Sequence, residues 1–211
     1  MTASDLSTAA RIRDAAIEVF GEQGFSVGVR KIAAAAGVSP GLVNHHFGSK
    51  DGLRAACDER VRQLTFDKKT QAATADNPGK GMLAALAEIE EYGPLVGYMV
   101  RSLQAGGPLA ESLFEHMVSD AEAYLQAGVD AGTIKPSRDH AARARYLMLI
   151  NLGATMLWIQ LHEARGEKID FGKAMRELTD VLTPPALEMY TQGLLTDPTL
   201  LETVLHPESR K

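Results

Sequence analysis

Residues 36–53 read AGVSPGLVNHHFGSKDGL, and this stretch predicts a turn, a short helix and the start of another helix. Gly37 can adopt the left-handed backbone conformation that follows a helix end. Ser39 can cap the next helix, and Pro40 suits its first position because the missing N–H is not needed there. Gly48-Ser49 then ends that helix and caps a further helix that begins at Lys50. We therefore expect a two-turn helix from Pro40 to Phe47.

The two sides of this short helix differ in chemistry. Its apolar side, together with the turn, is expected to pack on a scaffold through Val38, Val43 and Phe47. The outward side carries Pro40, Gly41, Leu42, Asn44, His45 and His46. A helix held in this way fits the major groove of DNA. Gly41 would let the backbone come close, Asn44 could pair with a base edge or a phosphate, and Leu42 could meet a thymine methyl group.

Few charged side chains lie on the outward side, so phosphate contacts must come from its surroundings. The helix N-terminal amides next to Ser39 and Pro40 can bind an anion, as can His46 and Lys50. Arg30 and Lys31, on the preceding expected helix, are further candidates. The overall net charge of -5 argues against a nucleic-acid partner, but its distribution is uneven. Residues 1–62 hold eight Lys/Arg and seven Asp/Glu, whereas residues 63–211 hold 14 and 20, so only the first segment can approach phosphates.

The whole chain predicts an all-α fold. Its 211 residues are 45% hydrophobic and 23% charged, which is typical of a globular protein. Apolar residues recur at helical spacing, and no alternating run is long enough for a strand. We expect a three-helix helix-turn-helix bundle with the start of a connecting helix in residues 1–62, and a larger helical domain in residues 63–211. The expected helices span about 7–23, 29–36, 40–47, 50–75, 80–92, 94–104, 108–130, 137–164 and 171–182, with Pro184-Pro185 as a break and a short helix after Asp197-Pro198.

The N-terminal segment resembles the DNA-binding domain of TetR-like transcriptional regulators. The resemblance covers about residues 11–64, through Ala15-Ala16, Phe20, Gly24-Phe25, Val29-Arg30, Ile32-Ala33, Ala36-Gly37-Val38-Ser39, Gly41, His46-Phe47 and Ser49-Lys50. It implies a helical homodimer that binds double-stranded operator DNA, with a recognition helix at Pro40–Phe47 and a C-terminal domain that binds a small-molecule effector. His46 and Lys50 match phosphate contacts of the family, and Gly41, Leu42 and Asn44 match base- or backbone-contacting positions.

Two positions depart from the family pattern. Family members usually carry threonine where Gly28 stands, which caps the second helix and often touches phosphate. Glycine retains the cap at a small cost but lacks the hydroxyl. Members usually carry tyrosine where Asn44 stands, so that contact must differ in this chain.

Residues 63–211 hold seven of the eight methionines, the tryptophan and all five tyrosines. Stripes of such residues form either the core or a pocket lined by adaptable side chains, which would suit an apolar or aromatic effector. The candidate effector contacts are Tyr92, Tyr98, Met99, Met117, Tyr124, Met156, Trp158 and His162.

Dimerisation is expected through the long helix around Tyr146–Leu161, where Gly153-Ala154 permits close helix approach, together with Phe171–Leu182. Two copies of these helices would form a four-helix bundle. The two-fold symmetry would then space the two recognition helices by roughly 34–36 Å for successive major grooves.

Other functional classes receive less support. Neighbouring side chains on a helix point about 100° apart, so His45-His46 predicts no metal site, and we expect neither a cofactor nor an enzyme. The one cysteine, Cys57, excludes a disulfide framework, and the N-terminus lacks a signal-peptide pattern, so we expect a cytoplasmic protein. The longest uncharged run, Tyr146–His162, has 17 residues and is too short for a membrane span. Two alternatives are an all-helical small-molecule carrier and a protein-interaction scaffold, neither of which would bind DNA.

Overall fold

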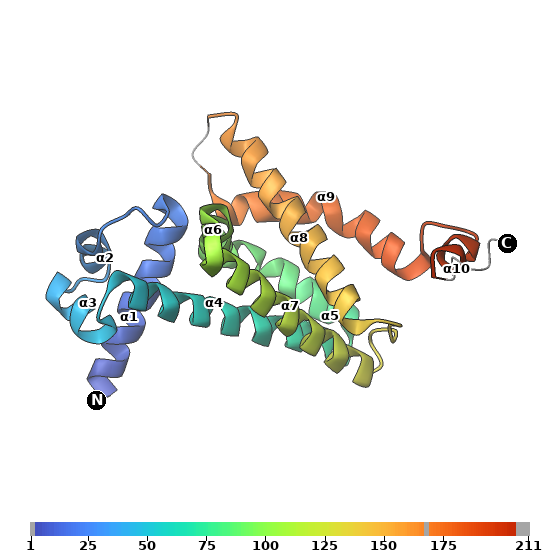
Figure 1. Cartoon of the computed structure of the whole chain (residues 1–211), viewed down its shortest axis with the longest axis horizontal. Helices are drawn as coiled ribbons and strands as arrows, with labels where there is room; N and C mark the ends of the chain where they lie inside the picture. The colour runs from blue at the N-terminus through green and yellow to red at the C-terminus, as the bar shows by residue number, and fades with distance from the viewer. Residues whose placement is uncertain (1–2, 167–168, 206–211) are drawn as a thin grey trace. The chain divides into compact units, whose positions relative to one another are not determined.

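The computed structural model describes residues 3–166 and 169–205, and these residues form helices and turns without a strand. The predicted all-α class is therefore confirmed (Figure 1). The elements are α1 (Ala3–Gln23), α2 (Val29–Ala35), α3 (Pro40–Phe47), α4 (Lys50–Ala73), α5 (Pro78–Ala87), the 3-10 turn η1 (Ile89–Tyr92), α6 (Gly93–Ala105), α7 (Gly107–Asp130), α8 (His140–Glu163), α9 (Phe171–Gln192) and α10 (Thr199–Leu205).

Two compact units divide the chain, residues 1–176 and residues 177–211. The division falls within α9. The outer ends of the two predicted domains, residues 1–2 and 206–211, lie outside the described residues. The domain boundary between residues 62 and 63 stays a prediction.

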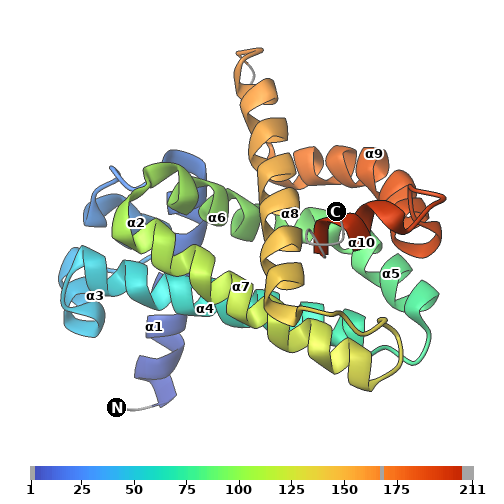
Figure 2. The same ribbon diagram turned by 45° about the vertical axis from the view of Figure 1, so that its right-hand side comes forward.

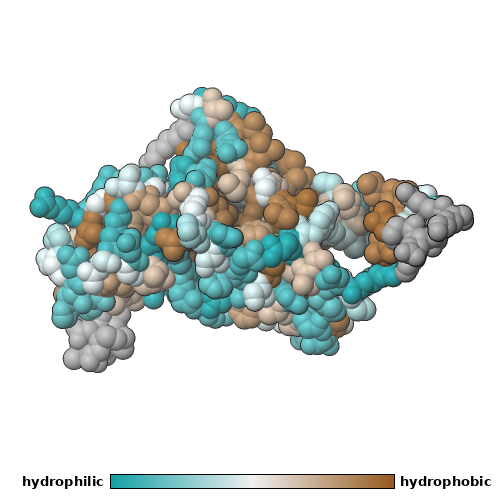
Figure 3. Space-filling model, viewed as in Figure 1, coloured by the Kyte–Doolittle hydropathy of each residue, from teal (hydrophilic) through white to brown (hydrophobic). Residues whose placement is uncertain are grey.

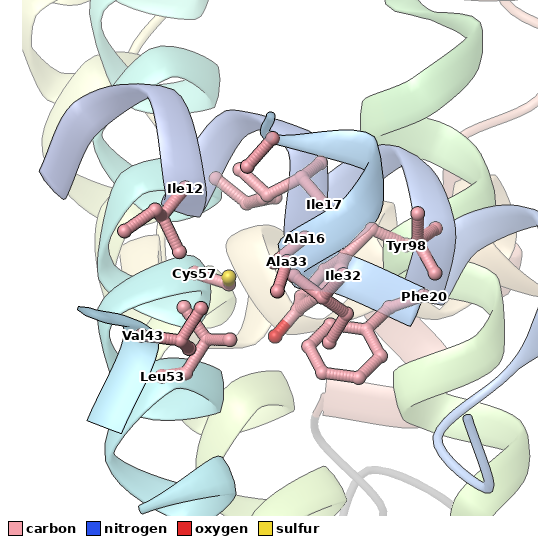
Figure 4. Close-up of a cluster of buried hydrophobic side chains, with 13 residues drawn as sticks. Ile12, Ala16, Ile17, Phe20, Ile32, Ala33, Val43, Leu53, Cys57 and Tyr98 are labelled. Atoms are coloured by element: carbon pink, nitrogen blue, oxygen red, sulfur yellow. The ribbon is translucent and has the colours of Figure 1, made fainter. Parts of the chain in front are cut away.

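The N-terminal bundle encloses the first hydrophobic core (Figure 4). Helices α1 to α4 each contribute fully buried side chains, among them Ile12, Phe20, Ile32, Val43, Leu53 and Cys57. Val38 and Phe47 are partly buried and pack against this core. The predicted scaffold side of the short helix is therefore confirmed.

Helix α6 packs directly on α1, and glycines mark the contact. A Cβ atom on Gly21 of α1 would lie 3.0 Å from the backbone nitrogen of Tyr98 in α6. A Cβ atom on Gly97 would lie 2.9 Å from the Phe171 ring at the start of α9. Because no side chain separates the backbones of α1 and α6 at Gly21, α6 packs closely on the N-terminal bundle.

The remaining helices of the first unit build two further cores. Helix α7 packs on α4 and on α8, and Figure 2 shows α8 crossing α7. One core joins α7 and α8 through Leu113, Met117, Ala121, Leu125, Ala144 and Met148. The other joins α6, α8 and the first turns of α9 through Val96, Val100, Ile159, Phe171 and Ala174.

The expected helix break at Pro184-Pro185 is wrong, because α9 continues through both prolines to Gln192. A proline inside a helix deprives the carbonyl four residues earlier of its donor. Here those carbonyls belong to Asp180 and Val181, which are exposed residues, so water can replace the lost donors. The expected helix over 80–92 is also interrupted, since α5 ends at Ala87 and the tighter turn η1 follows.

Candidate nucleic-acid interface

The recognition helix α3 has the predicted bounds and both predicted caps. Oγ of Ser39 accepts a hydrogen bond of 3.3 Å from the Leu42 N–H, and Pro40 occupies the first turn. At the other end Gly48 has φ 72°, a conformation that side chains other than glycine rarely adopt. Oγ of Ser49 then accepts a hydrogen bond of 3.0 Å from the Gly52 N–H at the start of α4.

Helix α3 presents a polar, small-residue surface to solvent. Pro40, Gly41, Asn44 and His45 are exposed, and Leu42 and His46 are partly exposed. A Cβ atom on Gly41 would meet only Oγ of Ser39, at 3.9 Å. The fold therefore does not require glycine at position 41, and the missing side chain leaves the backbone open to close approach.

The orientation of α3 is fixed by α4. A Cβ atom on Gly52 would lie 2.1 Å from the Phe47 carbonyl oxygen, so the first turn of α4 touches the end of α3 backbone to backbone. Val43 is buried against the core on the other side. Helix α3 is thus held by α4 on one side and by the core of the bundle on the other.

Lys50 has a structural contact that the sequence analysis missed. Its Nζ donates a hydrogen bond to the Phe25 carbonyl oxygen in the turn after α1. Since an ammonium group has three donors, two remain for a phosphate. The sequence offered no direct signal for this bond, because the two residues are 25 positions apart.

Arg30 and Lys31 occupy different surroundings although both are exposed. Lys31 lines a shallow groove of about 410 Å³ that Glu18 and Glu22 of α1 also line. Carboxylates beside an ammonium reduce its attraction for phosphate. Arg30 does not line this groove, so it is the better phosphate candidate of the two.

Tyr98 lies in a place that the sequence analysis did not predict. Its ring is fully buried in the N-terminal core, 5.5 Å from the Phe25 ring and 6.3 Å from the Phe20 ring. Its hydroxyl donates to Oδ1 of Asp58 at 2.7 Å and lies 3.2 Å from the Arg54 carbonyl oxygen. Burial and the Asp58 charge both raise the pKa of Tyr98, so it stays protonated. We therefore remove Tyr98 from the candidate effector contacts, because its ring and hydroxyl are both occupied by α1 and α4.

The other candidate effector residues fall into two neighbouring groups. Met117 and Tyr124 belong to the core between α7 and α8, and burial raises the pKa of Tyr124 to about 12. Tyr92 and Trp158 pack on the core around Phe171, and Met99 contacts both cores. The His162 ring lies 5.2 Å from the Trp158 ring. Met156 is half-buried and belongs to neither core.

Two buried polar atoms near these groups lack a hydrogen-bond partner among the described residues. They are Nε1 of Trp158 in α8 and Oγ of Ser102 in α6. A buried polar atom without a partner costs free energy, and binding sites are one place where that cost is found. Ser102 was missed from the sequence because an isolated serine on an apolar helix gives no signal.

Within residues 3–166 and 169–205, the side chains that could bind a metal are dispersed. No three His, Cys, Asp or Glu side chains gather there as a metal site. The rings of His45 and His46 instead meet edge to face at 5.4 Å. None of the described helices combines the length and apolar character that crossing a bilayer requires.

Comparison with known proteins places this geometry in a family. Residues 12–57 match the family described as bacterial regulatory proteins, tetR family, and residues 90–196 match the tetracyclin repressor-like C-terminal domain. The second match covers half of the chain. The chain belongs to the TetR family. This TetR-family chain is 49% identical over 205 residues to the HTH-type transcriptional regulatory protein RaaS of Mycobacterium tuberculosis, covering 97% of the chain and 95% of that relative.

Solved structures of TetR-family regulators share the fold. A TetR-family transcriptional regulator from Pectobacterium atrosepticum is 23% identical, with a TM-score of 0.55 over 93% of this chain and 98% of that one. The regulator FadR of Bacillus subtilis, solved in complex with stearoyl-CoA, is 20% identical, with a TM-score of 0.56 over 88% and 99%. The TetR-family chain is therefore a transcriptional regulator with a helix-turn-helix DNA-binding domain.

The family departure at Gly28 is visible in the structure. Gly28 is the N-cap of α2, with extended backbone angles and no side-chain cap. No atom lies within 4 Å of the position that its Cβ would take. A threonine would therefore fit at this position without displacing any neighbour.

Proposed function

We propose that this TetR-family protein is a homodimeric, ligand-responsive repressor that binds a palindromic operator in the cytoplasm. The observation that carries the proposal is the mounting of α3. Its apolar side is buried in the core, its end is held against α4, and its small polar residues face solvent. A helix so held can enter the major groove without changing shape.

The proposed DNA contacts divide by role. Gly41, Leu42 and Asn44 read base edges or approach the backbone, with Pro40 and His45 beside them. Phosphates are bound by Arg30, His46 and Lys50 and by the backbone amides that follow Ser39. Lys31 contributes less, because Glu18 and Glu22 line the groove beside it.

Helix α8 supports the dimer. Tyr146, Leu149, Ile150, Leu157 and Leu161 follow helical spacing along α8 and are each exposed by 50–58%. Figure 3 shows the resulting apolar surface over α8. Gly153 lies in this stripe with no atom within 4 Å of its Cβ position, which leaves room for a second helix. An exposed apolar stripe of this length is typical of a protein interface, and we assign it to the second copy.

The effector is proposed to bind among α6, α7 and α8. The side chains there are apolar and adaptable, and the unpartnered atoms Nε1 of Trp158 and Oγ of Ser102 could donate to a polar group of a ligand. The fold-level similarity to FadR, which binds stearoyl-CoA, is compatible with an apolar effector. The contacts would come from Tyr92, Met99, Met117, Tyr124, Met156, Trp158 and His162.

Coupling between the two sites would run through α6 and α4. An effector changes operator affinity only if it binds one arrangement of the reading helices better than another. Met99 lies in the effector region, and its neighbour Tyr98 lies in the DNA-binding core. On the other side Nη1 of Arg62 in α4 donates to Oδ1 of Asp120 in α7 at 2.9 Å. A shift of α6 or α7 would therefore reposition α4 and, with it, α3.

Operator binding is the direct test. The protein would be mixed with randomised duplex DNA, bound sequences would be enriched by gel retardation, and a palindromic consensus is the expected result. Alanine at His46 should weaken binding to all sequences and lower the salt dependence of the affinity by about one phosphate contact. Alanine at Asn44 should instead change the preferred sequence.

Lys31→Ala is the matched control for Arg30→Ala, since the two residues are adjacent, exposed and equally charged. Arg30→Ala should reduce operator affinity more. Absence of any retarded complex at moderate salt would contradict the proposal and favour the carrier or scaffold alternative.

A further inference from the structure

Three successive turns of α4 contact the same two aromatic residues. Nζ of Lys50 donates a hydrogen bond to the Phe25 carbonyl oxygen. The Arg54 guanidinium lies 3.9 Å from the centre of the Phe25 ring. Oδ1 of Asp58 accepts a hydrogen bond of 2.7 Å from the Tyr98 hydroxyl. Residues four apart lie on the same side of a helix, so these three α4 residues form one row that faces the two aromatic residues.

The Phe25 ring is held by aromatic neighbours from α1 and α6. It lies 4.9 Å from the Phe20 ring and meets the Tyr98 ring edge to face at 5.5 Å. Phe20 and Tyr98 are both fully buried in the first core (Figure 4). Phe25 itself belongs to the turn that joins α1 to α2. Because no helix fixes the backbone of this turn, the position of its carbonyl group depends on where the Phe25 ring is seated.

The ring and the carbonyl group of Phe25 are attached to the same Cα atom. The Tyr98 ring packs on the first, and the Lys50 ammonium binds the second. A displacement of Tyr98 by α6 therefore shifts the carbonyl group that holds Lys50. The two remaining donors of the ammonium point where this carbonyl group directs them, so the ability of Lys50 to reach a phosphate depends on Phe25.

Arg54 contributes to the seat of the ring rather than to a phosphate contact. Its guanidinium and the Phe25 ring form a cation–π pair. Burial raises the pKa of Asp58, whereas the Tyr98 hydrogen bond and the Arg54 charge lower it. Arg54 is thus close enough to Asp58 for the two charges to offset each other. Lys50 is left as the cation of this row that can bind DNA.

We propose that Phe25 is a positioning residue for operator binding, which holds the Lys50 ammonium towards the phosphate backbone and releases it when α6 moves Tyr98. This inference rests on the proposed operator binding and adds a route that bypasses the body of α4. An effector that prefers a displaced α6 would weaken one phosphate contact directly. That loss would be independent of any change in the spacing of the two recognition helices.

Salt-dependent operator binding by the full-length protein tests the role of Phe25. Each phosphate contact contributes about 0.9 to the slope of the logarithm of affinity against the logarithm of salt concentration. Lys50→Ala should lower that slope by about 0.9 and the affinity by roughly 10-fold. Phe25→Leu should lower the slope by a similar amount, because Lys50 loses its position. The double variant should bind within about twofold of Lys50→Ala, since both changes remove the same contact.

Phe20→Leu is the matched control. It makes the same substitution in the same core and also removes a ring that packs on Phe25. The Phe20 carbonyl oxygen, however, accepts from the Gly24 N–H and does not hold Lys50. The salt slope of Phe20→Leu should therefore equal that of the unmodified protein. Equal slopes for Phe25→Leu and Phe20→Leu, or a double variant in which the two losses of affinity multiply, would overturn the proposal.

Acetylation of Lys50 tests the same link without DNA. A limiting amount of an acetyl N-hydroxysuccinimide ester would be added, and peptide mass spectrometry would measure the rate at each lysine, with exposed Lys31 as the internal reference. The relative rate at Lys50 should rise at least about threefold in Phe25→Leu and in Tyr98→Leu, because the ammonium is no longer held. It should not change in Phe20→Leu or in Tyr98→Phe, which keeps the ring.

Circular dichroism would first establish that each variant is folded. If Phe25→Leu does not fold, Phe25→Met supplies a flexible apolar side chain that also lacks a ring. An unchanged Lys50 rate in the folded variants at positions 25 and 98 would overturn the proposal. An equal rise in Tyr98→Phe and Tyr98→Leu would also overturn it, because the link would then depend on the hydroxyl and not on the ring.

Failure of this inference and failure of the proposed function give different results. If Phe25→Leu retards DNA with the salt slope of the unmodified protein, Phe25 has no positioning role and the repressor proposal stands. If the unmodified protein retards no DNA while the acetylation responds as expected, the repressor proposal fails and the link from Tyr98 to Lys50 stands.

Discussion

The Tyr98 hydroxyl of α6 donates a 2.7 Å hydrogen bond to Oδ1 of Asp58 on α4. The two residues are 40 positions apart, and their bond joins the helix that leads into the proposed effector region to the helix that packs on α3. The Arg54 guanidinium, one turn earlier on α4, lies 3.9 Å from the centre of the Phe25 ring, which in turn packs on Tyr98. The bond is therefore one contact within a larger aromatic cluster.

Replacing Tyr98 with phenylalanine should destabilise the protein by about 1–2 kcal/mol, because the half-buried Asp58 carboxylate loses its donor. The aromatic packing would remain. Asp58→Asn is the matched variant, since an amide oxygen still accepts from the Tyr98 hydroxyl, and its unfolding free energy should change by less than about 0.5 kcal/mol. Urea unfolding measures the unfolding free energy of both variants. Equal stability of the two variants would show that the hydrogen bond contributes nothing.

Gly41→Ala should separate stability from DNA binding. The added methyl group meets no atom closer than 3.9 Å, and alanine in a helix interior is favoured over glycine by roughly 0.5–1 kcal/mol. The melting temperature should therefore rise. Operator affinity should fall, because the methyl group occupies the space that the DNA would enter. A variant that is more stable and binds the operator with unchanged affinity would remove Gly41 from the interface.

Gly28→Thr should restore the usual residue of the family. The position is an N-cap with extended backbone and free space, so a threonine hydroxyl can accept from the first amides of α2. The expected gain in unfolding free energy is a few tenths of a kcal/mol, since glycine is already an acceptable cap. Operator affinity should increase as well if the hydroxyl reaches a phosphate. Gly28→Ala serves as the control, because it adds a side chain without a hydroxyl.

Cys57 should be inert in the folded protein. Burial, followed by the nearby Asp58 charge, raises the pKa of its thiol from 9.0 to about 12. Because only the thiolate reacts, Ellman's reagent at pH 8 should label Cys57 after denaturation and leave the native protein unlabelled. The folded state holds this proton more tightly than the unfolded state does. The contribution of Cys57 to stability should therefore be constant below pH 9 and decrease as the pH rises from 9 towards 12.

Cys57→Ala should remove that part of the alkaline loss of stability. The pKa of Tyr124 is also raised to about 12, so Tyr124 titrates in the same range. The measurement is therefore the difference in unfolding free energy between Cys57→Ala and the unmodified protein at each pH. Rapid labelling of the native protein at pH 8 would contradict the prediction.

Local signals in the sequence were sufficient to predict α3 and its supports. The caps at Ser39 and Ser49, the glycine at position 48 and the apolar residues at Val43 and Phe47 all act within a few residues of each other. Such signals predicted the bounds of α3 and its buried side, whereas the all-α class followed from the helical spacing of apolar residues along the whole chain. The structure adds the Lys50 bond to Phe25 and the contact of Gly52 with Phe47, which depend on how successive helices meet.

Tyr98 shows where sequence reasoning stops. Its position on an apolar helix predicts burial, but periodicity does not say which neighbour buries it. Helix α6 contacts both α1 and α7. Tyr98 lies in the core that includes α1, whereas Leu103 packs on the core that includes α7. The prolines in α9 illustrate the same limit, since the cost of two missing donors depends on whether water reaches the carbonyls.

The close crossing of Gly21 and Gly97 sets a condition for anyone who builds hybrid regulators or biosensors from this protein. A junction placed near residue 62 would cut away Tyr98 and leave an unfilled space among Phe20, Phe25 and Asp58. We therefore expect a transplantable module to include α6 and to end at Ala105. A graft made there keeps Tyr98 within the bundle, and the incoming domain needs only to pack on the outer sides of α4 and α6.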